Sequence, residues 1–108
     1  MKLYLSLIAC FFVSLCAKAQ DITVLQINAK WNIENNVELN YLPSYVEYKF
    51  AYLEEQPQSI KQQIKSVPTI IVFKRNKAII QWDADISFQL RISREKVLAS
   101  IKNVKETF

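Results

Sequence analysis

The sequence predicts a small α/β domain built on a mixed β-sheet. Short runs of β-branched and aliphatic residues alternate with segments of helical character, which is typical of strands paired in a parallel half. The last two such runs are separated by only four residues, which indicates an antiparallel hairpin. A chain of 108 residues with 51% hydrophobic and 22% charged residues fits one globular domain with one small core.

The first half of the sheet is predicted from two segments. Ile22 to Ala29 is dense in aliphatic residues, as expected of a central strand buried on both faces. The polar residues 30–36 then form a turn. Val37 to Leu42 fits either a strand or a helical face, and Pro43 ends this segment. Tyr45 to Leu53, in which aromatic residues alternate imperfectly, is the second predicted strand.

A short helix and a hairpin follow. Gln56 to Lys65 is predicted to be a short helix, because Pro57 at its start suits the first turn of a helix. Thr69 to Phe73 and Ala78 to Trp82 are predicted hairpin strands, and Asn76 is the best candidate for a positive φ angle in their turn.

The last predicted element is a helix whose N-cap is Ser93. Asp83 to Ile92, which precedes this helix, is expected to be an extended loop or a continuation of the strand. The helix carries an acidic residue in its first turn and then an apolar stripe, formed by Glu95, Val97, Leu98, Ile101 and Val104.

The N-terminal segment has the pattern of a secretory signal peptide. Met1 to Ala19 contains a basic Lys2, an apolar run from Leu3 to Leu15 and a small-x-small ending at Ala17 and Ala19. We therefore expect cleavage before Gln20, a domain over residues 20–108, export to the periplasm or the medium, and no membrane span after cleavage. An uncleaved anchor is an alternative. Cys16 leaves lipid attachment as another, although Leu15 stands where that signal needs a small side chain.

Composition excludes several kinds of site in the predicted mature chain. Both cysteines, Cys10 and Cys16, lie in the leader, and the sequence contains no histidine and no glycine. Metal centres and Cys-His nucleophiles therefore lose their usual ligands and bases, and glycine-rich phosphate loops cannot form. Removal of Lys2 and Lys18 lowers the formal net charge from +4 to +2, which is too mild to indicate nucleic acid as a partner. We expect no cofactor and no metal.

Three landmarks resemble the thioredoxin family. Ser66 to Lys74 (SVPTIIVFK) looks like the family stretch that contains its cis-proline, here Pro68. Ala29-Lys30-Trp31 resembles the A-x-W that precedes the family's CxxC motif, and Tyr48 to Pro57 is similar to the strand and acidic loop before its middle helix. The resemblance implies a thioredoxin-like three-layer fold with a mixed four-stranded sheet.

The redox motif of that family is replaced in this sequence. Asn32-Ile33-Glu34-Asn35 follows Trp31, so both cysteine positions, Asn32 and Asn35, are asparagine. Disulfide exchange requires a thiolate that attacks sulfur, and an amide cannot perform this step. We expect no catalytic residue and therefore no enzyme. Catalysis by Glu34 or Asp83 is an alternative, although a lone carboxylate near a loop is usually a solvated charge.

Two further departures concern the surroundings of the motif. Gln26 stands where family members bury an aspartate for proton transfer, and Lys49 falls where they have a nearby lysine, so Gln26 and Lys49 are candidates for a polar pair. The stretch from Trp31 to Pro68 is also short. We therefore expect the helix after the active-site loop to be shortened or replaced by Val37 to Leu42, with that face of the sheet partly exposed or covered by a partner.

The resemblance implies a groove that needs no cysteine. In it, the backbone of Val67 before Pro68 would pair with an extended peptide, while Trp31 and Ile33 supply apolar contacts. We therefore expect a redox-inactive, protein- or peptide-binding module of the bacterial cell envelope. Alternatives are an accessory role beside a thiol-disulfide oxidoreductase, and a purely structural protein in which Trp31 and Pro68 only pack the fold. Trp82, Phe88 and Leu90 would then form either an oligomer surface or the last part of the core.

Overall fold

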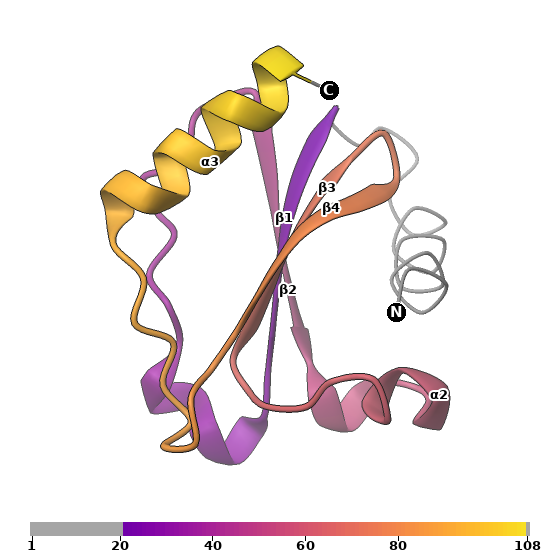
Figure 1. Cartoon of the computed structure of the whole chain (residues 1–108). Helices are drawn as coiled ribbons and strands as arrows, with labels where there is room; N and C mark the ends of the chain where they lie inside the picture. The colour runs from indigo at the N-terminus through magenta and orange to yellow at the C-terminus, as the bar shows by residue number, and fades with distance from the viewer. Residues whose placement is uncertain (1–20, 108) are drawn as a thin grey trace.

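A computed structural model describes residues 21–107, so the predicted signal peptide lies outside the described residues (Figure 1). The elements in chain order are β1 (Ile22–Asn28), the 3-10 helix η1 (Lys30–Asn35), β2 (Val46–Tyr52), the 3-10 turn η2 (Leu53–Glu55), α2 (Gln58–Lys61), β3 (Thr69–Lys74), β4 (Lys77–Asp83) and α3 (Arg94–Thr107). Each predicted strand is present within one or two residues of its expected bounds. Of the predicted helix over Gln56 to Lys65, only the turn of α2 forms.

The strands form one four-stranded mixed sheet in the order β2-β1-β3-β4. β1 is parallel to β2 and antiparallel to β3, and β3 pairs with β4 as an antiparallel hairpin. The predicted mixed α/β sheet with β1 at its centre is therefore confirmed. Because β1 and β3 run in opposite directions, the C-terminal end of β1 and the start of β3 lie at the same end of the sheet, where Ile27 is the partner of Thr69.

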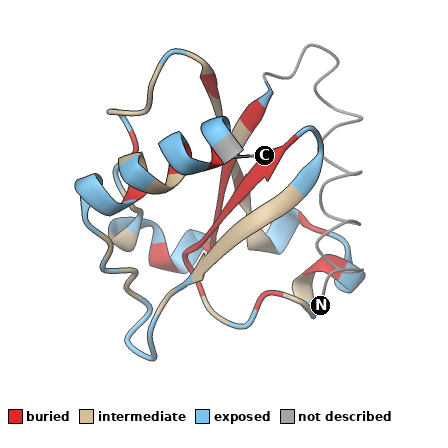
Figure 2. Ribbon diagram, turned by 45° about the horizontal axis from the view of Figure 1, so that its top comes forward, coloured by how far each residue is buried: buried red, intermediate tan, exposed pale blue. Residues whose placement is uncertain are grey.

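Helices cover both faces of this sheet, with α3 on one side and α2 on the other (Figure 1). The α3 face holds a buried cluster to which the helix contributes its apolar stripe, Val97, Ile101 and Val104. The opposite face holds a second cluster that includes Ile60 of α2. Figure 2 shows buried residues along the sheet and exposed ones on the outer side of α3. The helices are thus held by burial of their apolar sides.

Residues 36–45 replace the helix that was expected to be shortened. They form neither of the two predicted elements, strand or helix, but irregular chain with a turn at residues 40–41. Leu39 is buried in the α3-face cluster, and Val37, Tyr41, Leu42 and Tyr45 pack against that cluster. The expectation that this face is left partly exposed is therefore wrong, because extended chain with apolar side chains covers it as a helix would.

The connections around β3, β4 and α3 follow local chemistry. Both turn residues of the hairpin, Arg75 and Asn76, have positive φ angles of 52° and 70°, as two-residue hairpin turns require. The prediction for Asn76 is confirmed, and Arg75 was not foreseen. Ser93 is confirmed as an N-cap, since its Oγ accepts a hydrogen bond from the backbone N of Lys96 at 3.1 Å.

Residues 84–93 connect β4 to α3 as an irregular loop. Trp82, in β4 just before this loop, and Leu90, within the loop, pack against the α3-face cluster, whereas Phe88 remains exposed. Trp82 and Leu90 therefore belong to the core rather than to a free surface. Over residues 21–107, none of the helices is both long and apolar enough to cross a bilayer.

Candidate functional site

Three segments meet at one end of the sheet, at the bottom of Figure 1. They are η1 after β1, residues 66–68 before β3, and the loop after β4. Their meeting follows from the pairing, since Thr69 at the start of β3 is the partner of both Ile27 and Asp83. This end contains all the predicted site residues except Gln26, which lies in the middle of β1.

Asn32 is the buried centre of this end, with only 4% of its surface exposed. Its side-chain Nδ2 donates to the carbonyl oxygens of Val67 at 3.2 Å and Phe88 at 3.1 Å, and to Oδ1 of Asn28 at 3.0 Å. Asn32, which aligns with the first cysteine of the CxxC motif in the predicted resemblance, therefore connects the three segments through hydrogen bonds of its side chain. Buried amides are stable only when their hydrogen bonds are satisfied, which these acceptors provide.

Other asparagines complete this link. Asn35, the second predicted cysteine position, donates from Nδ2 to Oδ1 of Asn32 at 2.7 Å. Asn28 donates from Nδ2 to the carbonyl of Asn32 at 3.0 Å and to Oδ1 of Asn36, and its Oδ1 accepts from the backbone N of Ala29. Asn28 was not predicted as a site residue, although a polar residue at the end of a largely apolar buried strand was an available signal.

Gln26 is fully buried and holds the backbone of the irregular segment. Its Nε2 donates to the carbonyl of Val37 at 3.0 Å, and its Oε1 accepts from the backbone N of Val37 at 2.7 Å. The side-chain amide thus binds both backbone groups of Val37, as the backbone of a partner residue does in a β-ladder. Gln26 thus binds residues 36–45, which stand in place of the expected helix, to the sheet.

The predicted pair of Gln26 with Lys49 is wrong. Lys49 is the strand partner of Leu25, so the side chains of Gln26 and Lys49 leave opposite faces of the sheet. Lys49 instead forms an ion pair with Glu47, with Nζ 3.1 Å from Oε2. The partner of Gln26 from β2 is Tyr48, whose hydroxyl oxygen accepts a hydrogen bond from Nε2 of Gln26 at 3.0 Å. Partial burial raises the pKa of Tyr48 above its ordinary value of 10.0, although the Gln26 hydrogen bond acts the other way.

Val67 and Pro68 lie beneath the surface, joined by a cis peptide bond. Val67 has 2% of its surface exposed, and its carbonyl accepts the hydrogen bond from Asn32. The neighbouring Ser66 donates from Oγ to the carbonyl of Ala84 at 2.9 Å, which holds the start of the loop after β4 close to this segment. The backbone of Val67, which was predicted to pair with an extended peptide, therefore has its carbonyl already engaged by Asn32.

Large apolar side chains are exposed around this buried centre. Trp31 is 65% exposed and Ile33 is also exposed, both on η1. Phe88 lies against Trp31 with the two rings perpendicular and their centroids 5.0 Å apart. Ile86, on the same loop as Phe88, is 98% exposed. Phe88 was predicted to belong to an oligomer surface or to the core. Its contact with Trp31 was not predicted, because no local sequence pattern shows that the loop after β4 meets η1.

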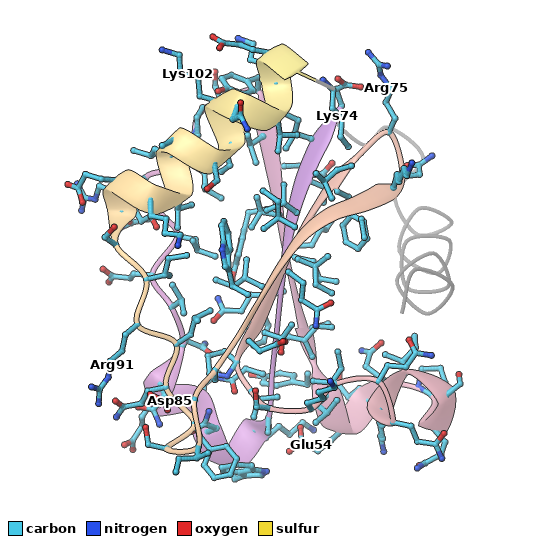
Figure 3. All side chains as sticks on the ribbon, viewed as in Figure 1. Glu54, Lys74, Arg75, Asp85, Arg91 and Lys102 are labelled. Carbon is cyan, nitrogen blue, oxygen red and sulfur yellow. The ribbon has the colours of Figure 1, made fainter. Side chains whose placement is uncertain are left out.

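An open pocket of about 340 Å³ lies beside the exposed side chains. Its lining comes from residues before Pro68 and from the loop after β4: Lys65, Ser66, Ala84, Asp85, Ile86 and Phe88. Asp85 and the loop that carries it lie next to η1 in Figure 3. Most of the exposed lining is apolar, so the pocket is suited to an apolar side chain.

The charged groups near the site have structural partners. Both carboxylate oxygens of Glu54 accept from the backbone N of Lys30, at 3.0 and 2.9 Å, and Lys30 Nζ lies 3.4 Å from Oε2 of Glu55. Asp83, a predicted alternative catalytic residue, accepts from Thr69 Oγ1 at 3.3 Å. Glu34, the other alternative, lies exposed on η1.

The chemistry available here is that of amides and apolar rings. The buried centre consists of asparagine side chains and backbone carbonyls, and none of these groups titrates near neutral pH. Among residues 21–107, no three Cys, His, Asp or Glu side chains lie close enough together to hold a metal ion. No protein-family model matches the chain, and no curated protein matches its sequence.

Proposed function

We propose that this chain is a redox-inactive, thioredoxin-like domain of the bacterial cell envelope that binds extended peptide or protein segments at the end of the sheet containing Trp31 and Pro68. The observation that carries the proposal is the gathering of exposed apolar side chains. Of the five large hydrophobic residues that are exposed within residues 21–107, four lie at this end: Trp31, Ile33, Ile86 and Phe88. Contiguous apolar patches on a soluble domain mark interaction sites more often than single exposed residues do.

The thioredoxin-like part of the proposal is supported by topology and by the loop before β3. The four strands form a mixed sheet with a parallel first pair and an antiparallel hairpin, which agrees with the mixed four-stranded sheet that the resemblance implies. The Val67–Pro68 bond has the cis isomer that the resemblance implies. Asn32 supports the redox-inactive part, because its amide is a buried structural donor rather than an exposed nucleophile.

Selection from a display library of random peptides tests the proposed binding. We expect peptides that bind the purified protein and lose about tenfold or more in affinity with Trp31→Ala, since aromatic anchors dominate such contacts. Tyr48→Ala is the matched control, because it removes an exposed aromatic ring outside this end. If Trp31→Ala binds the selected peptides as well as the unaltered protein does, the proposed site is wrong.

Two measurements address the remaining parts. In an insulin-reduction assay with dithiothreitol, the protein should not accelerate precipitation, because it offers no thiolate at residues 32 and 35. The N-terminal sequence of protein recovered from the cell envelope should begin at Gln20. Recovery from the cytoplasm with an intact N-terminus would contradict the envelope location.

A further inference from the structure

The loop after β4 places one of its own residues in the site. At Phe88 the backbone carbonyl accepts from Asn32 Nδ2 at 3.1 Å, and the ring packs edge-on against Trp31 at 5.0 Å between centroids. Phe88 therefore makes both kinds of contact that an extended ligand would make here, one through its backbone and one through its side chain. Its neighbour Ile86 is almost fully exposed on the same loop.

The contacts of Phe88 occupy the side-chain N–H groups of Asn32, which an outside ligand would need as hydrogen-bond donors. The amide of Asn32 has two hydrogens, and they already serve the oxygens of Asn28, Val67 and Phe88. The first two acceptors belong to the strand end and to the segment before β3, which are fixed by the sheet. Only the Phe88 carbonyl comes from a surface loop, so it is the acceptor that a ligand carbonyl can replace.

The backbone of Phe88 favours such a replacement. Its φ angle is 62°, in the left-handed region, which is unfavourable for a residue with a side chain. The loop also closes on itself: Asp85 donates from its backbone N to the carbonyl of Gln89 at 3.0 Å, and its Oδ1 accepts from the backbone N of Ser87 at 2.9 Å. The loop can therefore keep its own turn when the Phe88 contacts are lost.

We propose that residues 84–89 are an internal pseudo-ligand, and that the outside ligand is an extended segment with an aromatic side chain that displaces Phe88. In the bound state the ligand carbonyl takes the Asn32 hydrogen bond, and the ligand ring takes the place of the Phe88 ring against Trp31. The inference rests on the proposed peptide-binding function and adds to it a ligand class and a mode of regulation.

Calorimetric titration with two synthetic peptides tests this proposal. One peptide copies residues 84–91 of the chain, and the other carries alanine in place of its phenylalanine. The proteins are the unaltered chain, Phe88→Ala, and the control Arg91→Ala, which changes an exposed residue of the same loop outside the proposed binding surface. Phe88→Gly suits the left-handed backbone and serves as a second variant if Phe88→Ala folds poorly.

The Phe88 variant should bind the aromatic peptide about tenfold more tightly than the unaltered chain does, because the competing ring contact is gone. Arg91→Ala should bind like the unaltered chain, and the alanine peptide should bind weakly to every protein. Equal affinity of the unaltered chain and Phe88→Ala for the aromatic peptide would overturn the pseudo-ligand while leaving peptide binding intact. Trp31-dependent library peptides without aromatic residues would do the same. Absence of binding both here and in the library selection would remove the proposed function as well.

Discussion

The side-chain amide of Asn32 donates to the carbonyl of Val67 at 3.2 Å, across 35 residues of sequence. The bond connects η1, which follows the central strand, to the segment with the cis-proline. An asparagine at this position therefore has a structural task that a cysteine could not perform in the same way, since a thiol is a weak donor with a single hydrogen. Asn32 thus supplies the donor of a buried polar centre that joins these two segments.

Asn32→Ala should destabilise the fold by about 2–3 kcal/mol, because it removes the donor to the buried carbonyl of Val67 and one of the two donors to Oδ1 of Asn28. The free energy of unfolding from urea titration, followed by circular dichroism, measures this loss. Asn40→Ala, in an exposed turn, is the control and should change stability little. A loss in Asn32→Ala no greater than in the control would mean that the asparagine centre adds nothing to stability.

Gln26→Glu should destabilise the protein in a pH-dependent way. The substitution puts an oxygen where Nε2 now donates to Val37, in a fully buried position, so burial would raise the pKa of the new carboxyl group. A raised folded-state pKa gives stability that is present below the unfolded-state value of about 4.3 and is lost as pH rises through the folded-state value. The difference in unfolding free energy from the unaltered protein should therefore be larger at pH 8 than at pH 4. An equal difference at both pH values would count against this account of Gln26.

Lys74→Met should loosen the end of α3. Lys74 is buried, and its Nζ donates to the carbonyls of Val104 at 3.0 Å and Lys105 at 3.2 Å, where the helix has unpaired acceptors and a negative dipole end. We expect a loss of about 1–3 kcal/mol, and faster amide hydrogen exchange in the last turns of α3. Lys102→Met, on the exposed side of α3, is the matched control and should leave exchange unchanged (Figure 3). Similar exchange in both variants would refute the capping role of Lys74.

Acid should release the loop that carries Phe88. Hydrogen bonds from Ser87 lower the pKa of Asp85 below its ordinary value of 3.8. The turn is therefore stabilised above pH 3.8, and this contribution is lost as pH falls through the lower folded-state value. In a Trp82→Phe background, Trp31 fluorescence should change only below pH 3.8 as Phe88 moves away. Asp85→Asn should remove this step, and a step that persists in that variant would assign the change to another group.

The sheet was predictable because its determinants are local. The aliphatic run after Asp21, the hairpin around Asn76 and the cap at Ser93 each appear as predicted, since strand propensity, turn chemistry and capping depend on neighbouring residues. The segment after Asn36 was ambiguous for the same reason. Its spacing fits both a strand and a helix, and it forms neither because tertiary contacts fix its path, namely the hydrogen bonds of Gln26 to Val37 and the burial of Leu39.

The sequence by itself determined which chemistry is absent from residues 21–107, because the missing cysteine, histidine and glycine can be counted without a structure. It also placed Trp31 and Pro68 at matching ends of two strands. Only the tertiary structure decided that Asn32 bonds to both Val67 and Phe88, and that Phe88 packs on Trp31. The physical reason is that these contacts join loops far apart in the chain, and strand pairing, rather than any local pattern, brings those loops together.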